Sequence, residues 1–498
     1  MTYFSNASVR GALAGFRPVR RMGTPVTVRA TIMAAQIAVM MITVTAGSAH
    51  AQVVNPTPKL IQFGTLQAIG SNGSASNYRG QFVDRGNNTA VRDRPRGPLE
   101  PINIRLGAFT LSPSLDYDTY QTDNARREDN NGKSDTAYII RPRMTVASNW
   151  SRHAIGLGIG VAGTVYQDFS TEDTTDFEFQ ASGRLDIQRG SNLQSAYRFF
   201  DGSEGRGQAG LPNNVAEPST FRQDGLTIGG VWELTRTRLS ANVDFSKEKY
   251  DPLVLLDNSR LTQADRNNDG YGLTLRADFA MTPKTAIFAS LARDTRDYQD
   301  LGAIALPSRD STGTQALIGV NFDISDFYRG ELSAGYMDKT FESDLYEAAS
   351  AFIYRAAVEW FPTRTVTIGG VATRNIVESV IPGSGSAITT GLGLQADWDV
   401  RSNLVLSARA QRDMSSFSRV ATGIGAGLGT GLGTGLGTGL GTLTREDDRT
   451  LLNASAVFLL TQWLSMVLTL TNDQLNTNDP AGLNYNETRF GIRFTLRK

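Results

Sequence analysis

The sequence FIYRAAVEWFPTRTVTIGGVATR, residues 352–374, decides the fold of this chain. Every second residue of Phe352–Trp360 is apolar, and the residues between them include Arg355 and Glu359. A period of two with one apolar face and one partly charged face is typical of a β-strand. A turn at 362–364 reverses the chain, and the return arm alternates in the same way. This stretch predicts a β-hairpin.

The same alternation recurs from about residue 105 almost to the last residue, with no helical period of comparable length. Counting these runs predicts about 18 strands of roughly 10 to 14 residues, with 16 as the alternative. An even number of amphipathic strands is typical of a bacterial outer-membrane barrel, whose apolar face meets lipid. We therefore expect residues 105–498 to form an all-β, transmembrane, antiparallel up-and-down β-barrel.

The links between the expected strands alternate between short and long, as they do between the periplasmic and extracellular ends of outer-membrane barrels. Short links fall near 148–152, 235–237, 362–364 and 461–463, and long ones include 201–221 and 417–447. All five tryptophans lie in or near short links, and their amphipathic rings favour the membrane boundary. We expect a periplasmic aromatic girdle of Trp150, Trp232, Trp360, Trp398 and Trp463.

The first 104 residues do not alternate. Arginines precede an apolar run from Ile32 to Val44, and Ala49-His50-Ala51 ends the small residues that follow, which indicates a secretory signal peptide at 1–51. Residues 52–104 are rich in Gly, Asn, Ser and Pro, which favours an irregular periplasmic segment. The alternative is a plug that enters the barrel.

Charge and composition exclude several function classes. Residues 1–51 hold five Arg and no acid, so the remainder carries 44 basic and 49 acidic residues, a net charge of −5. The chain has no block of basic residues of the kind that would indicate nucleic acid as a partner. With no cysteine and a single histidine after residue 51, His153, we expect no catalytic residue, no metal and no cofactor.

The non-lipid face of the expected strands carries charges of both signs, which predicts a wet lumen, because a lipid-facing charge is unfavourable. These charges form either a solvated wall with internal salt bridges or an electrostatic filter for an anionic or sugar-like solute. The candidate pore-lining residues are Arg141, Arg143, Arg184, Asp186, Arg198, Arg276, Asp278, Arg293, Glu331, Lys339, Arg355, Glu359, Arg374, Asp397, Asp399, Arg409, Arg489 and Arg493.

A low-complexity tract at 427–442 repeats Gly-Leu-Gly-Thr four times within a long link. Four short copies cannot bury a core, so we expect a loop insertion rather than a solenoid.

One stretch resembles a known family. IRLGAFTLSPSL at 104–115, followed by Tyr120, Asp123-Asn124, Ser134-Asp135 and Pro142, is similar to the putative β-barrel porin family 2. The resemblance implies an outer-membrane barrel of Gram-negative bacteria associated with exopolysaccharide synthesis or export. It implies no catalytic residue.

These observations predict a porin-like barrel that passes, or helps to export, hydrophilic solutes. The alternatives are a non-conducting structural or assembly barrel and an outer-membrane enzyme. The expected partners are outer-membrane lipid, the barrel-assembly machinery, and a polysaccharide or other hydrophilic solute. The oligomeric state stays open.

Overall fold

The computed structural model describes residues 89–498 except 131, 209–210, 213, 300–307, 326, 382, 419–444 and 480–483. The expected signal peptide, most of the 52–104 segment and the Gly-Leu-Gly-Thr repeats lie outside the described residues. Within the described ranges, no helix is long and apolar enough to cross a membrane.

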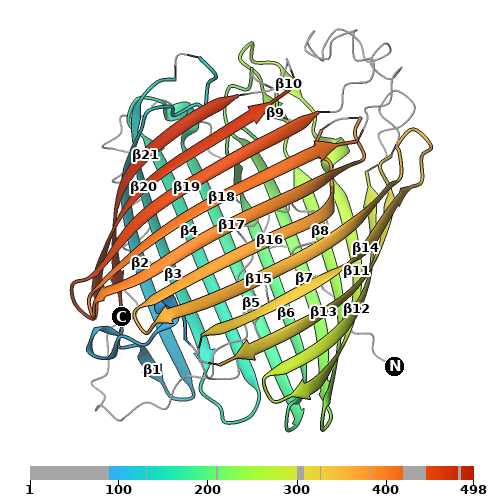
Figure 1. Ribbon diagram of the computed structural model, residues 1–498. Coiled ribbons are helices and arrows are strands. Elements are labelled where there is room, and N and C mark those ends of the chain that lie inside the picture. Colours follow the sequence, from blue (N-terminus) through green and yellow to red (C-terminus); the bar gives the residue numbers. More distant parts are fainter. Residues whose placement is uncertain are drawn as a thin grey trace, which may run out of the picture. The chain divides into compact units, whose positions relative to one another are not determined.

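The described chain forms a closed antiparallel barrel of 18 strands, as the alternation predicted (Figure 1). Each strand pairs with the next, and β21 pairs with β2 to close the wall. The wall strands are β2 Phe109–Thr122, β3 Asp135–Ser148, β4 Ala154–Tyr166, β5 Thr174–Gln188, β6 Ser191–Glu204, β7 Ser219–Glu233, β8 Thr237–Tyr250, β11 Asn268–Thr282, β12 Thr285–Tyr298, β13 Ser311–Ile324, β14 Tyr328–Phe341, β15 Ala349–Thr363, β16 Val366–Glu378, β17 Ser386–Arg401, β18 Leu404–Phe417, β19 Glu446–Leu459, β20 Leu464–Thr477 and β21 Tyr485–Arg497.

A few short elements complete the described chain. Strand β1 (Ile104–Leu106) pairs only with the start of β2, and β9 (Leu253–Val254) forms a small hairpin with β10 (Arg260–Leu261) in the loop after β8. The single-turn 3-10 helices in the described residues are η2 Val91–Asp93, η3 Gly97–Leu99, η4 Ser170–Glu172 and η5 Ala264–Arg266.

The two faces of the wall differ as the sequence pattern predicted. Directly opposed residues on neighbouring strands share a face, so the register sorts side chains into an outer and an inner set. On β15 the outer Phe352 is 57% exposed, whereas the inner Ile353 and Glu359 are each 3% exposed. The middle of β13 carries the outer Ile318, which is 72% exposed. An exposed apolar outer surface fits a lipid environment.

The strands are longer than the apolar band of a membrane. They hold 13 to 16 residues, which at about 3.3 Å per residue and about 40° of tilt span roughly 35 Å, against a band of about 25 Å. Ion pairs on the outer face lie near the long-loop ends, such as Arg222–Asp201 at 2.7 Å and Lys247–Asp269 at 2.8 Å. These pairs lie where the strands project beyond the band.

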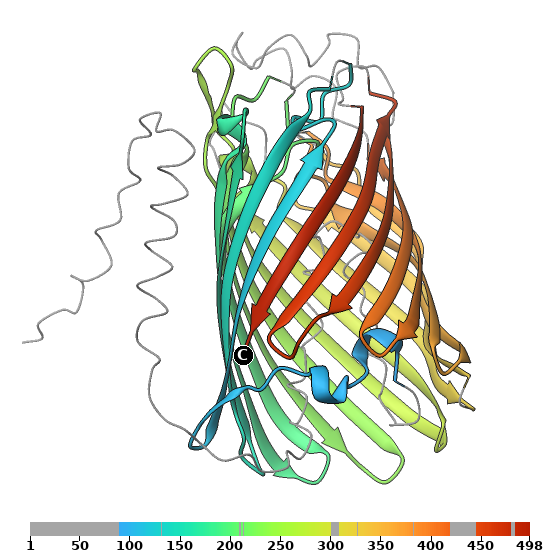
Figure 2. The same ribbon diagram turned by 90° about the vertical axis from the view of Figure 1, so that its left-hand side faces the viewer.

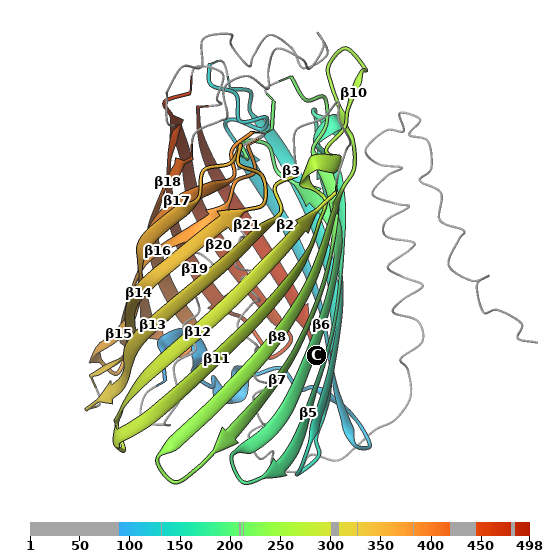
Figure 3. The same ribbon diagram turned by 90° about the vertical axis from the view of Figure 1, so that its right-hand side faces the viewer.

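Short turns gather at one rim and long loops at the other (Figure 3). All five tryptophans lie at the short-turn rim, and each is 37% to 56% exposed. Trp360 stacks on Tyr328 of the neighbouring strand at 6.3 Å between ring centroids, and Trp150 meets Phe109 edge-on at 5.7 Å. Amphipathic rings at one rim are typical of a membrane–water boundary. We take this rim as the periplasmic one.

Leu275 and Thr274 lie in the middle of β11, on the outer and inner faces respectively. We expect Leu275→Arg to destabilise the barrel by about 2–4 kcal/mol in lipid vesicles, because the charge would face hydrocarbon. Thr274→Arg, which places the charge in the lumen, should lower the free energy of unfolding by less than about half of that amount. Reversible urea unfolding of both variants measures the difference, and equal losses would contradict the two-faced wall.

Candidate functional site: the polar inner wall

Ion pairs cover much of the inner wall, and many of them join residues from different strands or from a strand and a loop. Asp118 of β2 binds Arg141 of β3 and lies 2.5 Å from Nε of Arg493 of β21. Because these three strands include the β2–β21 closure, the pairs also fasten the seam where the barrel closes. Charged side chains of both signs therefore face the lumen at this seam.

A second cluster lies nearer the extracellular rim. Arg127, in the loop after β2, lies 2.9 Å from Glu487 and 3.3 Å from Asp473. The same two carboxylates bind the predicted Arg489 at 2.6 Å and Arg449 at 2.7 Å. Three guanidinium groups thus share two carboxylates. The loop after β2 is thereby held against the inner face of β20 and β21.

Across the barrel from the β2–β21 closure, Arg276 of β11 lies 2.8 Å from Asp278 and 2.9 Å from Glu331 of β14. Its guanidinium carbon also lies 3.6 Å from the ring centroid of Phe288 on β12. Two strands, β12 and β13, lie between β11 and β14, so this contact crosses the curved inner surface rather than one strand pair. The wall is rigidified here by charge rather than by an apolar core.

Several predicted residues lie on the inner face with partners close by. Arg184 lies 2.9 Å from Asp186, and Arg198 lies 3.2 Å from Glu178. Arg409 donates to Gln411 at 3.0 Å. Arg355 shares the inner face with Ser333, and Arg143 with Ser114.

The structure places two predicted pore residues, Arg293 and Arg374, on the outer face instead. Arg293 lies opposite Leu273, and Arg374 lies opposite Tyr354, both outward-facing partners. Arg374 also donates to Thr390 of β17 at 3.4 Å. The expectation that every charge on a strand must face the lumen fails here, at two positions just past the middle of β12 and β16 towards the extracellular side.

His153 has a structural partner at the periplasmic turn after β3. Its backbone N–H donates to Asp186 Oδ2 at 2.7 Å, and its Nδ1 accepts the backbone N–H of Asp186 at 3.0 Å. Its φ of 64° lies in the left-handed region, which this pair of contacts stabilises. Among the described residues, no group of three or more His, Cys, Asp or Glu could hold a metal ion.

The described end of the N-terminal segment lies inside the barrel at the periplasmic rim (Figure 2). We call Thr89–Glu100 the strap. Val91 is fully buried, and its N–H donates to Thr367 of β16 at 3.0 Å. The described end of the segment therefore lies against the inner wall, and the choice between an irregular periplasmic segment and a plug for residues 52–104 stays a prediction.

Arginines fasten the strap to three carboxylates of the inner wall. Arg92 binds Glu359 of β15 and lies 3.2 Å from Asp397 of β17, while Arg96 binds Asp399. Glu359 and Asp397 are 3% and 1% exposed, so their charges are buried with the strap in place.

Burial opposes the charge of Arg92, but the attraction of Glu359, Asp93 and Asp397 outweighs it and raises the pKa of the guanidinium. The strap therefore keeps this positive charge at any pH that the protein meets. Sequence reasoning found Glu359, Asp397 and Asp399 from their alternation but missed Arg92 and Arg96, because an irregular segment gives no face to assign.

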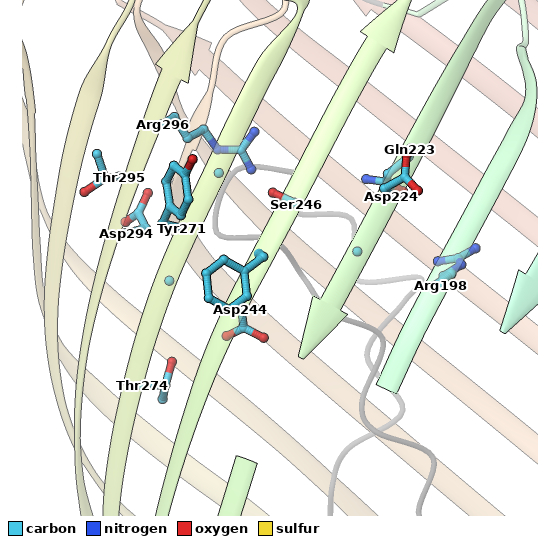
Figure 4. Close-up of a pocket in the computed structure, with 14 residues that line it drawn as sticks. Arg198, Gln223, Asp224, Asp244, Ser246, Tyr271, Thr274, Asp294, Thr295 and Arg296 are labelled. Carbon is cyan, nitrogen blue, oxygen red and sulfur yellow. The ribbon is translucent and has the colours of Figure 1, made fainter. Parts of the chain in front are cut away.

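A shallow pocket of about 110 Å³ is recessed into the wall between β6 and β12 (Figure 4). Its lining includes Gly225, Gly270 and Gly272, three inward positions without side chains. Polar side chains that surround these glycines on the inner face are Arg198, Gln223, Asp244, Ser246, Thr274, Asp294 and Arg296. On the inner face, two arginines and two aspartates balance in charge and offer many hydrogen-bonding groups, while the third aspartate of the lining, Asp224, belongs to the outer face of β7.

An exposed apolar exterior, a closed sheet and a charged interior define a membrane-spanning β-barrel of the porin type. The family model described as Putative beta-barrel porin 2 matches residues 97–498. The chain therefore belongs to that family of porin-like outer-membrane barrels, as the resemblance at 104–142 indicated.

No curated protein matches the chain significantly in sequence. Solved structures that are similar include the siderophore receptor PirA from Pseudomonas aeruginosa. The match has 9% sequence identity and a TM-score of 0.41, and it covers 80% of this chain and 81% of that chain. Pseudomonas aeruginosa OpdL has 12% identity, 79% and 99% coverage and a TM-score of 0.40. Acinetobacter baumannii OccAB3 has 9% identity, 79% and 100% coverage and a TM-score of 0.38.

The ion pairs of the strap give a direct test. Endoproteinase Asp-N should cleave the folded wild-type protein slowly before Asp93, because the strap is held inside the barrel. The double variant Arg92→Gln/Arg96→Gln should be cleaved there about tenfold faster or more, since three partly buried ion pairs are lost. Mass spectrometry of the released fragment measures the rate. Arg105→Gln, at an exposed position on β1, is the control, and equal rates in all three proteins would exclude a fastened strap.

Proposed function

We propose that this barrel passes hydrophilic solutes across the outer membrane of a Gram-negative bacterium, after export directed by the signal peptide at 1–51. The observation that carries the proposal is the inner wall, where charged residues of both signs line a closed sheet. Eighteen strands enclose a space wide enough for an aqueous path unless chain segments fill it. The strap occupies part of that space at the periplasmic rim.

We further propose that the solute is a glycan linked to surface polysaccharide. The balanced charge of the wall pocket favours a neutral, polyhydroxylated solute over a strongly anionic one, because an anion would need excess cations. Glycines allow a sugar ring to approach the backbone, while Gln223, Asp244 and Ser246 offer hydroxyl partners. The family resemblance points in the same direction.

The second candidate is a non-conducting barrel with a structural or assembly role. The strap favours this structural role, because Val91 and Arg92 occupy part of the lumen and would obstruct a solute there. An enzymatic role has less support, because His153 is bound to the backbone of Asp186 at a turn.

Conductance of the purified, folded protein in planar bilayers separates the first two candidates. We expect discrete channel steps that become larger in Arg92→Gln/Arg96→Gln, because the strap would leave the periplasmic opening. Liposome swelling with neutral oligosaccharides and with size-matched sugar acids then tests the solute class. Faster entry of the neutral sugars supports the glycan proposal. No conductance in either protein would exclude the pore and favour the structural role.

A further inference from the structure

The wall is not fully paired between β15 and β16. Their pairing runs from the periplasmic turn up to Tyr354↔Arg374, and no pair joins Ala349–Ile353 to Asn375–Glu378. Both segments are described, and both are strands: the first pairs with β14 and the second with β17. Two strand edges are therefore left unpaired at the extracellular end of this seam, where Figure 1 shows the β14–β15 loop apart from the end of β16.

The described residues 375–381 and 383–387, which we call the gate hairpin, have turned into the lumen. Continuing the register, Ile376 would lie outside, opposite Phe352, because Arg374 lies opposite Tyr354. Instead Ile376 is fully buried in a cluster with Met337 and Ile353, both from the inner faces of β14 and β15. The side of the hairpin that should face lipid thus lies against the inside of the neighbouring wall.

The other side of the gate hairpin is covered as well. Val377 and Ala387 pack in a second buried cluster with Ile381 and with Phe417 of β18. The hairpin is therefore enclosed on both faces within the ring of strands, where it narrows the extracellular opening.

Charged groups fasten the gate hairpin to the inner wall. Glu378 binds Lys339 of β14 and accepts a hydrogen bond from Ser311 of β13 at 2.8 Å. Lys339 is fully buried and also lies 3.1 Å from Asp294 of β12. In the loop after β12, Arg309 donates to the carbonyl of Ser379 at 2.5 Å. We call these contacts the latch.

The inward position leaves polar groups unsatisfied where β16 departs from β15. The buried atoms Thr373 Oγ1, Asn375 Oδ1 and Glu378 Oε2 have no hydrogen-bond partner. Buried polar atoms without partners are unfavourable, and unpaired strand edges are unfavourable in a barrel wall. The inward position thus depends on the latch and on the two apolar clusters.

We propose that the gate hairpin swings between this inward position and an outward one, in which residues 375–378 pair with 350–353 and complete the wall. Each position has its own stabilising contacts: the latch and buried side chains inward, the strand pairing outward. Two packed arrangements of comparable free energy are what a switching element requires. The outward position widens the extracellular opening, and its consequence for passage rests on the proposed function.

A disulfide distinguishes the two positions, and the chain contains no cysteine that would interfere. In the inward position, Phe352 points outward from β15 while Ile376 lies against its inner face, so Phe352→Cys/Ile376→Cys cannot cross-link. In the outward position the two residues are directly opposed. We expect slow cross-linking under mild oxidation in lipid vesicles. Ala356→Cys/Ala372→Cys, already opposed in the same kind of pair, is the matched control and should cross-link at once.

Opening the latch should speed the reaction. Adding Glu378→Gln should raise the cross-linking rate at position 352/376 about tenfold or more, because Lys339 keeps Asp294 as a partner while the hairpin loses its charge contact. Arg309→Gln, in a loop, offers a second variant that alters no wall strand. Neither change should affect the control pair. Failure of 352/376 to cross-link in all three backgrounds, with a reactive control, would overturn the proposal.

Conductance then separates the gate from the proposed function. Oxidised Phe352→Cys/Ile376→Cys should conduct more than its reduced form. If the disulfide forms but neither form conducts, the gate hairpin moves and the transport proposal fails. If the protein conducts but the disulfide never forms, the pore stands and the gate is wrong.

Discussion

The structure depends on one constraint: backbone N–H and C=O groups inside a membrane must bond to one another. A closed sheet meets this requirement, and it leaves side chains as the only means of adapting each face to its solvent. Alternation along each strand then gives lipid an apolar surface and gives the interior a polar one. The ion pairs of Asp118 with Arg141 and Arg493 show the result, since they join three strands across the β2–β21 closure.

The same constraint makes the β15–β16 seam unusual. Shorter interruptions occur in the β3–β4 and β5–β6 pairings, but the unpaired stretch between β15 and β16 is longer. At the extracellular end of this seam, Ile376 does not lie on the outer face but is buried in a cluster with Met337 and Ile353. The strap at the other rim follows a similar principle, because Arg92 lies inside the barrel and pairs with Glu359 and Asp397. Segments that leave the wall at both rims are held inside by charge.

The fold was predictable because it rests on a repeated local pattern. Each alternating run carries its own evidence, so the number of strands, the alternation of short and long links and the face of residues such as Glu359 follow from the sequence. The errors at Arg293 and Arg374 arose because both positions were assigned to the lumen from their charge alone, whereas the strand register places them on the outer face. The strap and the gate hairpin could not be predicted, since their positions depend on contacts distant in sequence, such as Arg92 with Glu359 and Glu378 with Lys339.

The most direct measurement compares two adjacent residues in the middle of β19, Ala454 on the outer face and Ser455 on the inner one. Each is replaced singly by cysteine, labelled with an environment-sensitive fluorophore, and exposed to a quencher dissolved in the bilayer and another dissolved in water. The label at position 454 should be quenched from the lipid and the label at 455 from the water. Equal quenching of both labels, or the reverse order, would contradict a barrel with a lipid-facing exterior and a wet interior.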